Sequence, residues 1–303
     1  MTLVADEERG VVRILCDLFG HTRAAYYKGR KKRERKALES ELVVQEVLSI
    51  RQKQRRLGAR KLYHKLGEFF CEHGIEMGRD AFFDLLRGYS LLVRKRRMRK
   101  PRTTLSYRGG RRYANLAREL EPTRANQLWV SDITYIRTTQ GFGYLSLITD
   151  AYSRKIVGYR LSEDLTAAGC VAALSMALRA NPDRRGLIHH SDRGVQYYSA
   201  RYMKALGQDI RVSMTEKSDP LENAIAERVN GILKQEFLLR KYRNITEARR
   251  GVAEAVGIYN DERPHMSIDM LTPAEAHSRS GELKRRWKNY FRQDKAETFQ
   301  TAV

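Results

Sequence analysis

The feature that most constrains the fold is a set of three closely spaced strand-like segments in the middle of the chain. Residues 128–136, 144–150 and 155–161 are rich in β-branched and aromatic side chains, which favour a pleated, half-buried backbone. Only short polar turns separate them, and strands joined by short turns pair antiparallel. We therefore expect an antiparallel meander over residues 128–161.

The segments that follow the meander alternate between helix and strand. An alanine-rich stretch at 166–180 predicts a helix that ends before Pro182, because proline lacks the amide that a helix interior needs. A short apolar strand is expected at 186–192, a helix at 199–206 and a strand at 210–214. Three antiparallel strands followed by this alternation predict an α/β fold, with a mixed five-stranded sheet and flanking helices.

Before residue 94 the spacing of the apolar residues is helical. Two helical pairs are expected, at about 11–30 and about 59–92, with a connecting helix at 36–55. Each pair resembles a helix-turn-helix, whose second helix enters the major groove of DNA. Arg79 and Arg87 would face water on the last helix and are candidate DNA contacts. The alternative is an ordinary helical hairpin with no DNA role.

The sharpest change of composition lies at residues 94–112, which are basic, contain proline and a glycine pair, and lack apolar periodicity. They predict an exposed linker, either a solvated tether or a segment that lies along a DNA backbone. Four of its residues are candidate DNA contacts: Arg94, Lys95, Arg96 and Arg97. The predicted division is a helical DNA-binding region at 1–93, a basic linker at 94–120, an α/β core at 121–240 and a helical extension at 241–303.

The charge of the chain points to a polyanionic partner. Its net charge is +22, of which residues 1–120 carry +16 and residues 121–303 carry +6. No stretch of about 18 apolar residues predicts a membrane span, and the N-terminus lacks the pattern of a secretory signal. Three scattered cysteines are typical of a reducing compartment. We therefore expect a cytoplasmic protein, no membrane partner, and nucleic acid as the partner.

Three acids in separate segments are candidates for metal-dependent phosphodiester chemistry, which two Mg²⁺ or Mn²⁺ ions held by carboxylates can support. Asp132 lies among apolar residues of the first strand, and Asp192 ends the strand at 186–192. Glu227 lies on a predicted helix, in one polar stripe with Asn223, Asn230 and Lys234. Each acid has an alternative role: a satisfied buried aspartate, a turn residue, and a surface acid paired to a basic neighbour on its helix.

Five sequence blocks, in order, carry a resemblance to a known family. They are WVSDITYI, LSLITDAYSRKIVGY, HHSDRGVQYYS, DPLENAIAERVNGILKQE and YNDERPHMSIDMLTPAEA. They span roughly residues 121–276 and resemble the second-frame (orfB-type) transposases of bacterial insertion sequences, which have a retroviral-integrase-like, ribonuclease-H-like DDE core. The spacings of 60 residues from Asp132 to Asp192, and of 35 from there to Glu227, also fit.

The resemblance implies a transposase that binds double-stranded DNA, at the terminal inverted repeats and at a target. It implies that Asp132, Asp192 and Glu227 bind the metal and that Lys234 contacts DNA. It also implies a homo-oligomer and, in many relatives, a companion helix-turn-helix protein from a first reading frame. Glu222 stands where the family often has aspartate and competes with Glu227 as the third acid.

Other polar residues near the acids have open roles. Asp150 is a possible ligand, or a partner of Arg154. His189 and His190 are expected to support the site rather than bind metal, and residues 196–198 either line a DNA channel or join the core. Two rival functions stay open: an integrase or metal nuclease with the same core, and a DNA-binding repressor that no longer cuts.

Overall fold

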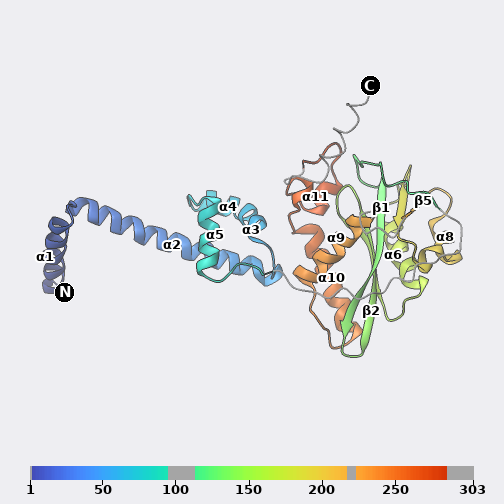
Figure 1. The fold of residues 1–303 in the computed structure, drawn as a ribbon, viewed down its shortest axis with the longest axis horizontal. Helices are drawn as coiled ribbons and strands as arrows, with labels where there is room; N and C mark the ends of the chain where they lie inside the picture. The colour runs from blue at the N-terminus through green and yellow to red at the C-terminus, as the bar shows by residue number, and fades with distance from the viewer. Residues whose placement is uncertain (1, 95–112, 217–222, 285–303) are drawn as a thin grey trace, which may run out of the picture. The chain divides into compact units, whose positions relative to one another are not determined.

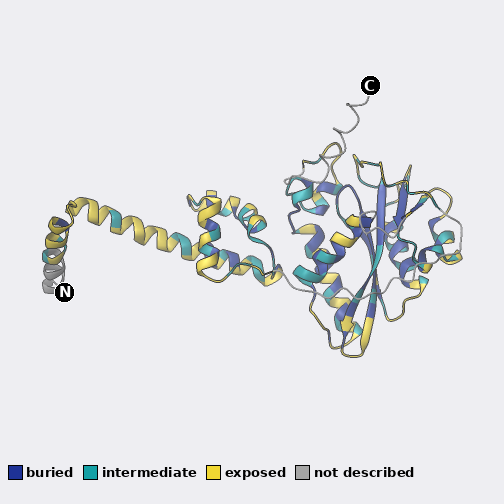
Figure 2. Cartoon of the chain, in the orientation of Figure 1, coloured by how far each residue is buried: buried dark blue, intermediate teal, exposed yellow. Residues whose placement is uncertain are grey.

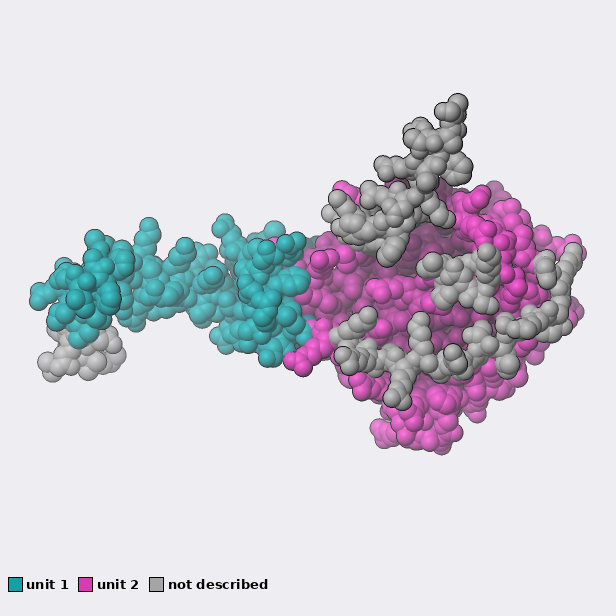
Figure 3. Space-filling model, in the orientation of Figure 1, with its two compact units in different colours: residues 1–53, 66–92 teal, residues 54–65, 93–303 magenta. Residues whose placement is uncertain are grey.

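The computed structural model describes residues 2–94, 113–216 and 223–284. The chain forms two compact units (Figure 3). The first comprises residues 1–53 and 66–92, and the second comprises residues 54–65 and 93–303. The sequence prediction placed residues 54–65 with the N-terminal helices, whereas the structure groups them with the C-terminal unit. Most of the predicted linker, residues 95–112, lies outside the described residues.

The first unit is helical and is dominated by one long helix. Its helices are α1 (Thr2–Leu18), α2 (Arg23–Lys53), α4 (Gly67–Glu72) and α5 (Arg79–Gly88). The hydroxyl of Thr22 accepts a hydrogen bond from the Ala25 amide at 3.1 Å and starts α2. The second helix of the first predicted pair and the predicted connecting helix are therefore one continuous helix (Figure 1).

The helix predicted over 59–72 is divided in two. It becomes α3 (Ala59–Lys65) and α4, with Leu66 between them. Leu66 is fully buried although it lies outside both helices. Several apolar side chains of the first unit are buried: Val43, Val44, Val47, Leu66, Phe70, Phe82 and Leu86.

The second unit contains the expected mixed sheet. Its strands are β1 (Leu128–Thr138), β2 (Gly141–Asp150), β3 (Ile156–Ser162), β4 (Ile188–Ser191) and β5 (Arg211–Met214). Their order is β3-β2-β1-β4-β5. The first three strands pair antiparallel as predicted, and β4 and β5 add in parallel on the other side of β1. β1 is therefore the central strand of the sheet.

Helices cover both faces of the sheet (Figure 1). One face carries α6 (Ala167–Ala180), α7 (Val195–Tyr198) and α8 (Ala200–Leu206), and its core includes Trp129, Ile148, Leu174 and Tyr202. The other carries α9 (Ala224–Ile232), the π-helix η2 (Leu233–Phe237) and α10 (Ile245–Asp261), and its core includes Leu145, Leu147, Val229 and Tyr259. The 3₁₀ turn η3 (Met266–Ile268) and α11 (Pro273–His277) follow. Figure 2 shows the strands as mostly buried.

The contact between α6 and the sheet is close enough to require a glycine. A Cβ atom at Gly158 on β3 would lie 2.2 Å from the carbonyl oxygen of Ala173 on α6. Any larger residue would push the helix away from the sheet. Among the helices of the described residues, none is both long enough and apolar enough to cross a membrane.

Candidate active site

The register of two parallel strands places Asp132 beside Asp192. The β1–β4 ladder ends at the pair Ser131↔Ser191, and each aspartate is the next residue along its strand. Neighbouring strands lie about 4.8 Å apart, so the two acids lie side by side at the same level, Asp132 within β1 and Asp192 just after β4. Asp132 and Asp192 are 60 residues apart in the sequence, and they become neighbours because β4 pairs directly with β1.

Each carboxylate is held by local donors. One oxygen of Asp132 accepts a hydrogen bond from the Ile133 amide at 2.9 Å, and the other accepts one from the Asn230 side-chain amide at 2.7 Å. Asp192 accepts a hydrogen bond from the amide of Gly194 at 3.1 Å, which fixes the turn after β4. Burial raises the pKa of Asp192, and this hydrogen bond opposes that rise.

The two acids interact electrostatically. Burial, followed by the neighbouring Asp192 carboxylate, raises the pKa of Asp132 to about 7. The hydrogen bonds from Asn230 and Ile133 lower it, and the carboxylate of Glu227 adds a smaller upward contribution. The site therefore carries an excess of negative charge at neutral pH, because the half-buried carboxylate of Asp132 lies near those of Asp192 and Glu227.

Glu227 reaches the site from α9, which is attached to β1 on either side of it. The side-chain amide of Asn223 donates to the Ser131 carbonyl at 2.9 Å, and Asn230 donates to Asp132. Glu227 lies four residues after the first and three before the second, so it shares their helix face. Its side chain is exposed, in contrast to the two asparagines.

Lys234 continues the same polar stripe, within the π-helix that follows α9. Burial lowers the pKa of Lys234, and the Asp132 carboxylate raises it, so the two groups lie within electrostatic range. A π-turn is rare and occurs often at functional sites.

The donor set fits a hard divalent cation in its chemistry. Carboxylate oxygens are the ligands that such ions prefer, and a cation would relieve the repulsion that raises the pKa of Asp132. The side-chain oxygen of Asn230 is also buried without a hydrogen-bond partner in the described part of the chain. The three acids are not close enough together in this structure to form a metal site, however. No three His, Cys, Asp or Glu side chains of the described residues are grouped closely enough to hold a metal ion.

Comparisons with known proteins point to one family. Two family models, both described as integrase core domain, match residues 122–220 and 208–273. The chain is 34% identical over 266 residues to the insertion element IS600 uncharacterized 31 kDa protein of Shigella sonnei, covering 86% of this chain and 96% of that protein. It is 31% identical to the putative transposase for insertion sequence element IS986/IS6110 of Mycobacterium tuberculosis, covering 72% and 80%. It is 33% identical to the transposase for insertion sequence element IS629 of Shigella sonnei, covering 72% and 73%.

The chain belongs to the transposases of bacterial insertion sequences, with an integrase-type core. Among solved structures, the transposase is similar to the HTLV-2 integrase catalytic core domain in complex with magnesium, with a TM-score of 0.41 and 17% identity. That match covers 52% of this chain and 99% of the other. The simian T-cell lymphotropic virus intasome matches with a TM-score of 0.43 and 17% identity, covering 76% of each chain.

Sequence reasoning left the two asparagines of the transposase without a role. Asn223 and Asn230 were recognised only as members of the polar stripe on the predicted helix. Their spacing of four residues before and three after Glu227 was the available signal, because it places all three on one face. Their hydrogen bonds to β1 depend on how the helix packs against the sheet, and the spacing does not predict that packing. Glu222, the competing third acid, lies outside the described residues.

The histidines beside Asp192 belong to a buried polar network. The Nε2 atom of His189 lies 2.7 Å from the Ser131 hydroxyl and 2.9 Å from the Tyr202 hydroxyl. Burial lowers the pKa of His189 to about 3, so it is neutral. His190 is buried against the Ser213 hydroxyl at 2.8 Å. Both support the strand from within the core.

Residues 196–198 and Asp150 also contribute to the packing of the transposase. Gln196 and Tyr197 are buried, and the side-chain amide of Gln196 donates to the Leu165 carbonyl at 2.9 Å. The carboxylate of Asp150 is fully buried and accepts hydrogen bonds from the amides of Asn126 and Ser153, at 2.7 and 2.8 Å. It closes the turn between β2 and β3.

The predicted DNA contacts of the N-terminal region are exposed but ion-paired. Arg79 contacts Asp80 at 2.9 Å, and Arg87 pairs with Asp84, all on α5. Arg94 is exposed. The other three predicted contacts, Lys95, Arg96 and Arg97, lie outside the described residues.

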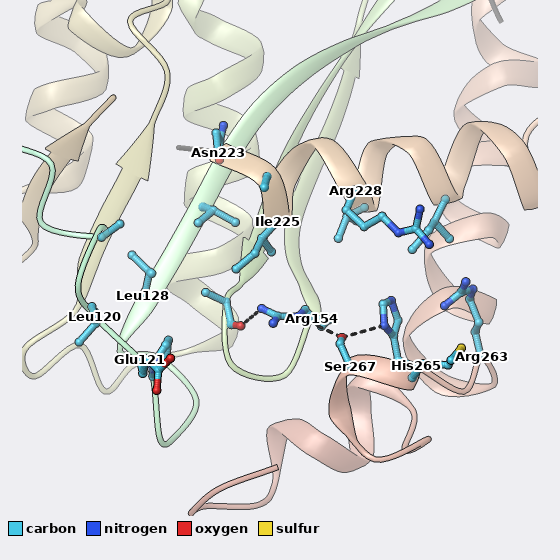
Figure 4. Close-up of a pocket in the computed structure, with 18 of the residues that line it drawn as sticks. Leu120, Glu121, Leu128, Arg154, Asn223, Ile225, Arg228, Arg263, His265 and Ser267 are labelled. Carbon is cyan, nitrogen blue, oxygen red and sulfur yellow. Dashed lines mark hydrogen bonds between the residues drawn. The ribbon is translucent and has the colours of Figure 1, made fainter. Parts of the chain in front are cut away.

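The opposite face of α9 borders a cavity of about 840 Å³ (Figure 4). Ile225, Arg228, Val229 and Ile232 line it from the side of α9 away from Glu227, and Asn223, which belongs to the Glu227 stripe, lines it at the start of the helix. Its other walls come from the segment before β1, from β1, from the β2–β3 turn, from Lys61 and from the block at 259–276. None of Asp132, Asp192 and Glu227 lines this cavity, although α9 borders it.

The block at 259–276 has a structural role beside this cavity. Arg263 is 1% exposed and forms a two-point ion pair with Glu236, at 2.7 and 2.8 Å. Lys61 contacts the same carboxylate at 3.4 Å. Ser267 connects Arg154 to His265 by hydrogen bonds of 3.4 and 3.2 Å (Figure 4). These contacts join the end of α10 to the π-helix and to the β2–β3 turn.

Proposed function

We propose that this transposase cuts and joins DNA strands at a site formed by Asp132, Asp192 and Glu227, which bind two Mg²⁺ or Mn²⁺ ions. The observation that carries the proposal is the pair of aspartates at the end of the β1–β4 ladder, where burial and mutual repulsion raise the pKa of Asp132. An unpaired arrangement of this kind is costly unless a cation offsets it.

The residues around the acids have distinct parts in this proposal. Asn230 orients the Asp132 carboxylate through its 2.7 Å hydrogen bond, and Lys234 binds a phosphate of the DNA end. Metal ions bound to the three acids would supply charge stabilisation for the attacking and leaving oxygens. No serine or tyrosine nucleophile is required, because the DNA and water supply the reacting oxygens.

Two displacements at phosphorus make up the proposed reaction. In the first, a water oxygen bonds to phosphorus at the 3′ end of the element, which frees a 3′-OH on the element and leaves a 5′-phosphate on the flanking DNA. In the second, that 3′-OH bonds to the phosphorus of another phosphodiester and displaces a 3′-OH there. The number of phosphodiester bonds is unchanged by the second step, so no energy source is needed. Positioning of the two strands supplies much of the rate.

The partners in this proposal are DNA and further protein chains. Double-stranded DNA would be bound at the terminal inverted repeats and at the target, in keeping with the net charge of +22. A homo-oligomer would hold two ends together. A companion helix-turn-helix protein from a first reading frame would assist end recognition.

The test is cleavage and joining of linear DNA that carries the inverted repeats flanking the gene. Asp132→Asn, Asp192→Asn and Glu227→Gln should each abolish Mg²⁺-dependent cleavage and joining while DNA binding is retained. The matched controls are Asp209→Asn and Glu254→Gln, which change exposed acids elsewhere in the same unit and should retain activity. Cleavage and joining by any of the first three variants would refute the assignment of that residue.

A DNA-binding repressor is the outcome that would replace this proposal. It would be indicated by a wild-type chain that binds the repeats tightly yet cuts nothing with either Mg²⁺ or Mn²⁺. Cleavage of DNA regardless of the repeats, without joining, would indicate a metal nuclease.

A further inference from the structure

The N-terminal part of α2 has the highest concentration of positive charge among the described helices. Residues 23–36, here called the basic segment, contain eight basic side chains and one acidic one, a net charge of +7 over 14 residues. The basic residues are Arg23, Lys28, Arg30, Lys31, Lys32, Arg33, Arg35 and Lys36. Such a density of like charge opposes helix formation unless a polyanion offsets it.

The basic segment takes no part in the core of its unit. Every residue in it is exposed except Gly29, which is half-buried, and Figure 2 shows the contrast along the helix. The buried residues of α2 are Val43, Val44 and Val47, all in its C-terminal half. The C-terminal half therefore anchors the helix, and the basic segment extends from it into solvent.

Positive charge surrounds the basic segment instead of forming one stripe. At 100° per residue, its eight basic positions are distributed over the whole circumference. Two ion pairs run along the helix, Arg30 with Glu34 at 2.9 Å and Arg35 with Glu39 at 2.7 Å. Exposed pairs of this kind contribute little, and the segment keeps its excess of +7. A flat anionic surface would leave half of these charges unmatched.

The major groove of double-stranded DNA matches this distribution. The groove is about 12 Å wide and accepts an α-helix, which is about 10–12 Å across with its side chains. Phosphates line both edges of the groove, so they would meet cations on both sides of the helix. At 1.5 Å per residue the segment is about 21 Å long, which is enough to cross one groove.

The helix-turn-helix pattern selects two helices, the start of α2 and α5, and α5 is the weaker candidate. α5 carries two arginines and two aspartates, and these form the pairs Arg79–Asp80 and Arg87–Asp84. Its net charge is zero, so it offers no excess of positive charge to phosphates.

We propose that the basic segment of α2 lies in the major groove of the bound duplex and neutralises its phosphates. The proposal rests on the proposed function, because it assumes a DNA substrate. It adds a DNA-binding surface to that function and makes the phosphate contacts of α2 stronger than those of α5. Contacts to phosphates add affinity for any sequence, so both end-bearing and random DNA should depend on the segment.

The experiment measures DNA affinity against salt concentration for the full-length protein. Each phosphate contact that is lost reduces the slope of log affinity against log salt by about 0.9. A variant with Lys31→Gln, Lys32→Gln and Arg33→Gln should therefore lose about 2–3 from the slope, on both end-bearing and random duplexes. Glutamine preserves helix propensity, and circular dichroism would verify that the helix content is unchanged.

Two controls carry the same kind of change elsewhere. Arg201→Gln, Lys204→Gln and Arg211→Gln remove three exposed charges from α8 and β5, and their slope should change by less than about 1. Arg79→Gln with Arg87→Gln should likewise change it by less than about 1. An unchanged slope for the basic-segment variant, or an equal loss in the α8 and β5 variant, would overturn the proposal.

The outcome is separable from that of the proposed function. Asp132→Asn should retain the full salt slope while it abolishes cleavage. If the basic-segment variant keeps the wild-type slope while Asp132→Asn is inactive, the groove contact is wrong and the catalytic site stands.

Discussion

Replacement of Asp132 by asparagine should stabilise the metal-free protein at alkaline pH, although it should abolish catalysis. In the folded chain the pKa of Asp132 is raised to about 7, against 3.8 for an ordinary aspartate. Between about pH 4 and pH 7 the folded protein therefore holds a proton that the unfolded chain has lost. The free energy of unfolding falls as pH rises through this window and stays lowered above it. Asparagine removes this loss.

The magnitude follows from the two pKa values. Their difference corresponds to an upper limit of about 4 kcal/mol at pH 8. Because the carboxylate is half-buried and reached by solvent, we expect about 2 kcal/mol. For a domain of this size that is a rise in melting temperature of about 4–8 °C. The side-chain oxygen of Asn230, buried without a partner among the described residues, would also accept a hydrogen bond from the new amide after rotation.

The assay is thermal unfolding in the presence of EDTA at pH 8 and pH 5. The gain should be largest at pH 8, where the whole loss of stability between about pH 4 and pH 7 has accumulated, and fall below half at pH 5, where only the first part of that loss has accumulated. The exposed Asp209→Asn is the matched control and should melt like the wild type at both pH values. A variant that melts no higher than the wild type at pH 8 would refute the electrostatic argument. A gain of equal size at both pH values would show that the cause is not titration.

Three further substitutions test the hydrogen bond to Asp132 and two packing contacts elsewhere in the second unit. Asn230→Ala should lower the cleavage rate about 10–100-fold at limiting Mg²⁺, since it removes the hydrogen bond that orients Asp132; an unaltered Mg²⁺ titration would contradict this. Arg263→Ala should lower the free energy of unfolding in urea by about 3–5 kcal/mol, because it leaves the Glu236 carboxylate buried without its two-point partner, whereas a loss below about 1 kcal/mol would mean that solvent reaches that carboxylate. Gly158→Ala should cost about 1–3 kcal/mol by forcing α6 from the sheet, and a neutral result in the same urea titration would show that the helix moves freely.

The local elements were largely predictable from the sequence. The meander follows from β-branched segments with short turns between them, and α6 ends where Pro182 follows Asn181. The boundaries of the N-terminal helices were less predictable from the sequence. The helix predicted over 59–72 is interrupted at Leu66, although the apolar spacing of Leu62 and Leu66 is that of a continuous helix and both are buried. α2 runs without interruption because nothing in it forces a break.

What the sequence determined by itself was which residues are candidates for the chemistry and which face of its own element each one occupies. Glu227, Asn230 and Lys234 share a helix face because 3.6 residues make a turn. The tertiary structure alone decided that β4 pairs with β1 rather than with β3, and that the pairing ends at Ser131 and Ser191. Periodicity is a property of neighbours in the chain, whereas the approach of Asp132 to Asp192 depends on strand order and register, which only packing of the whole sheet sets.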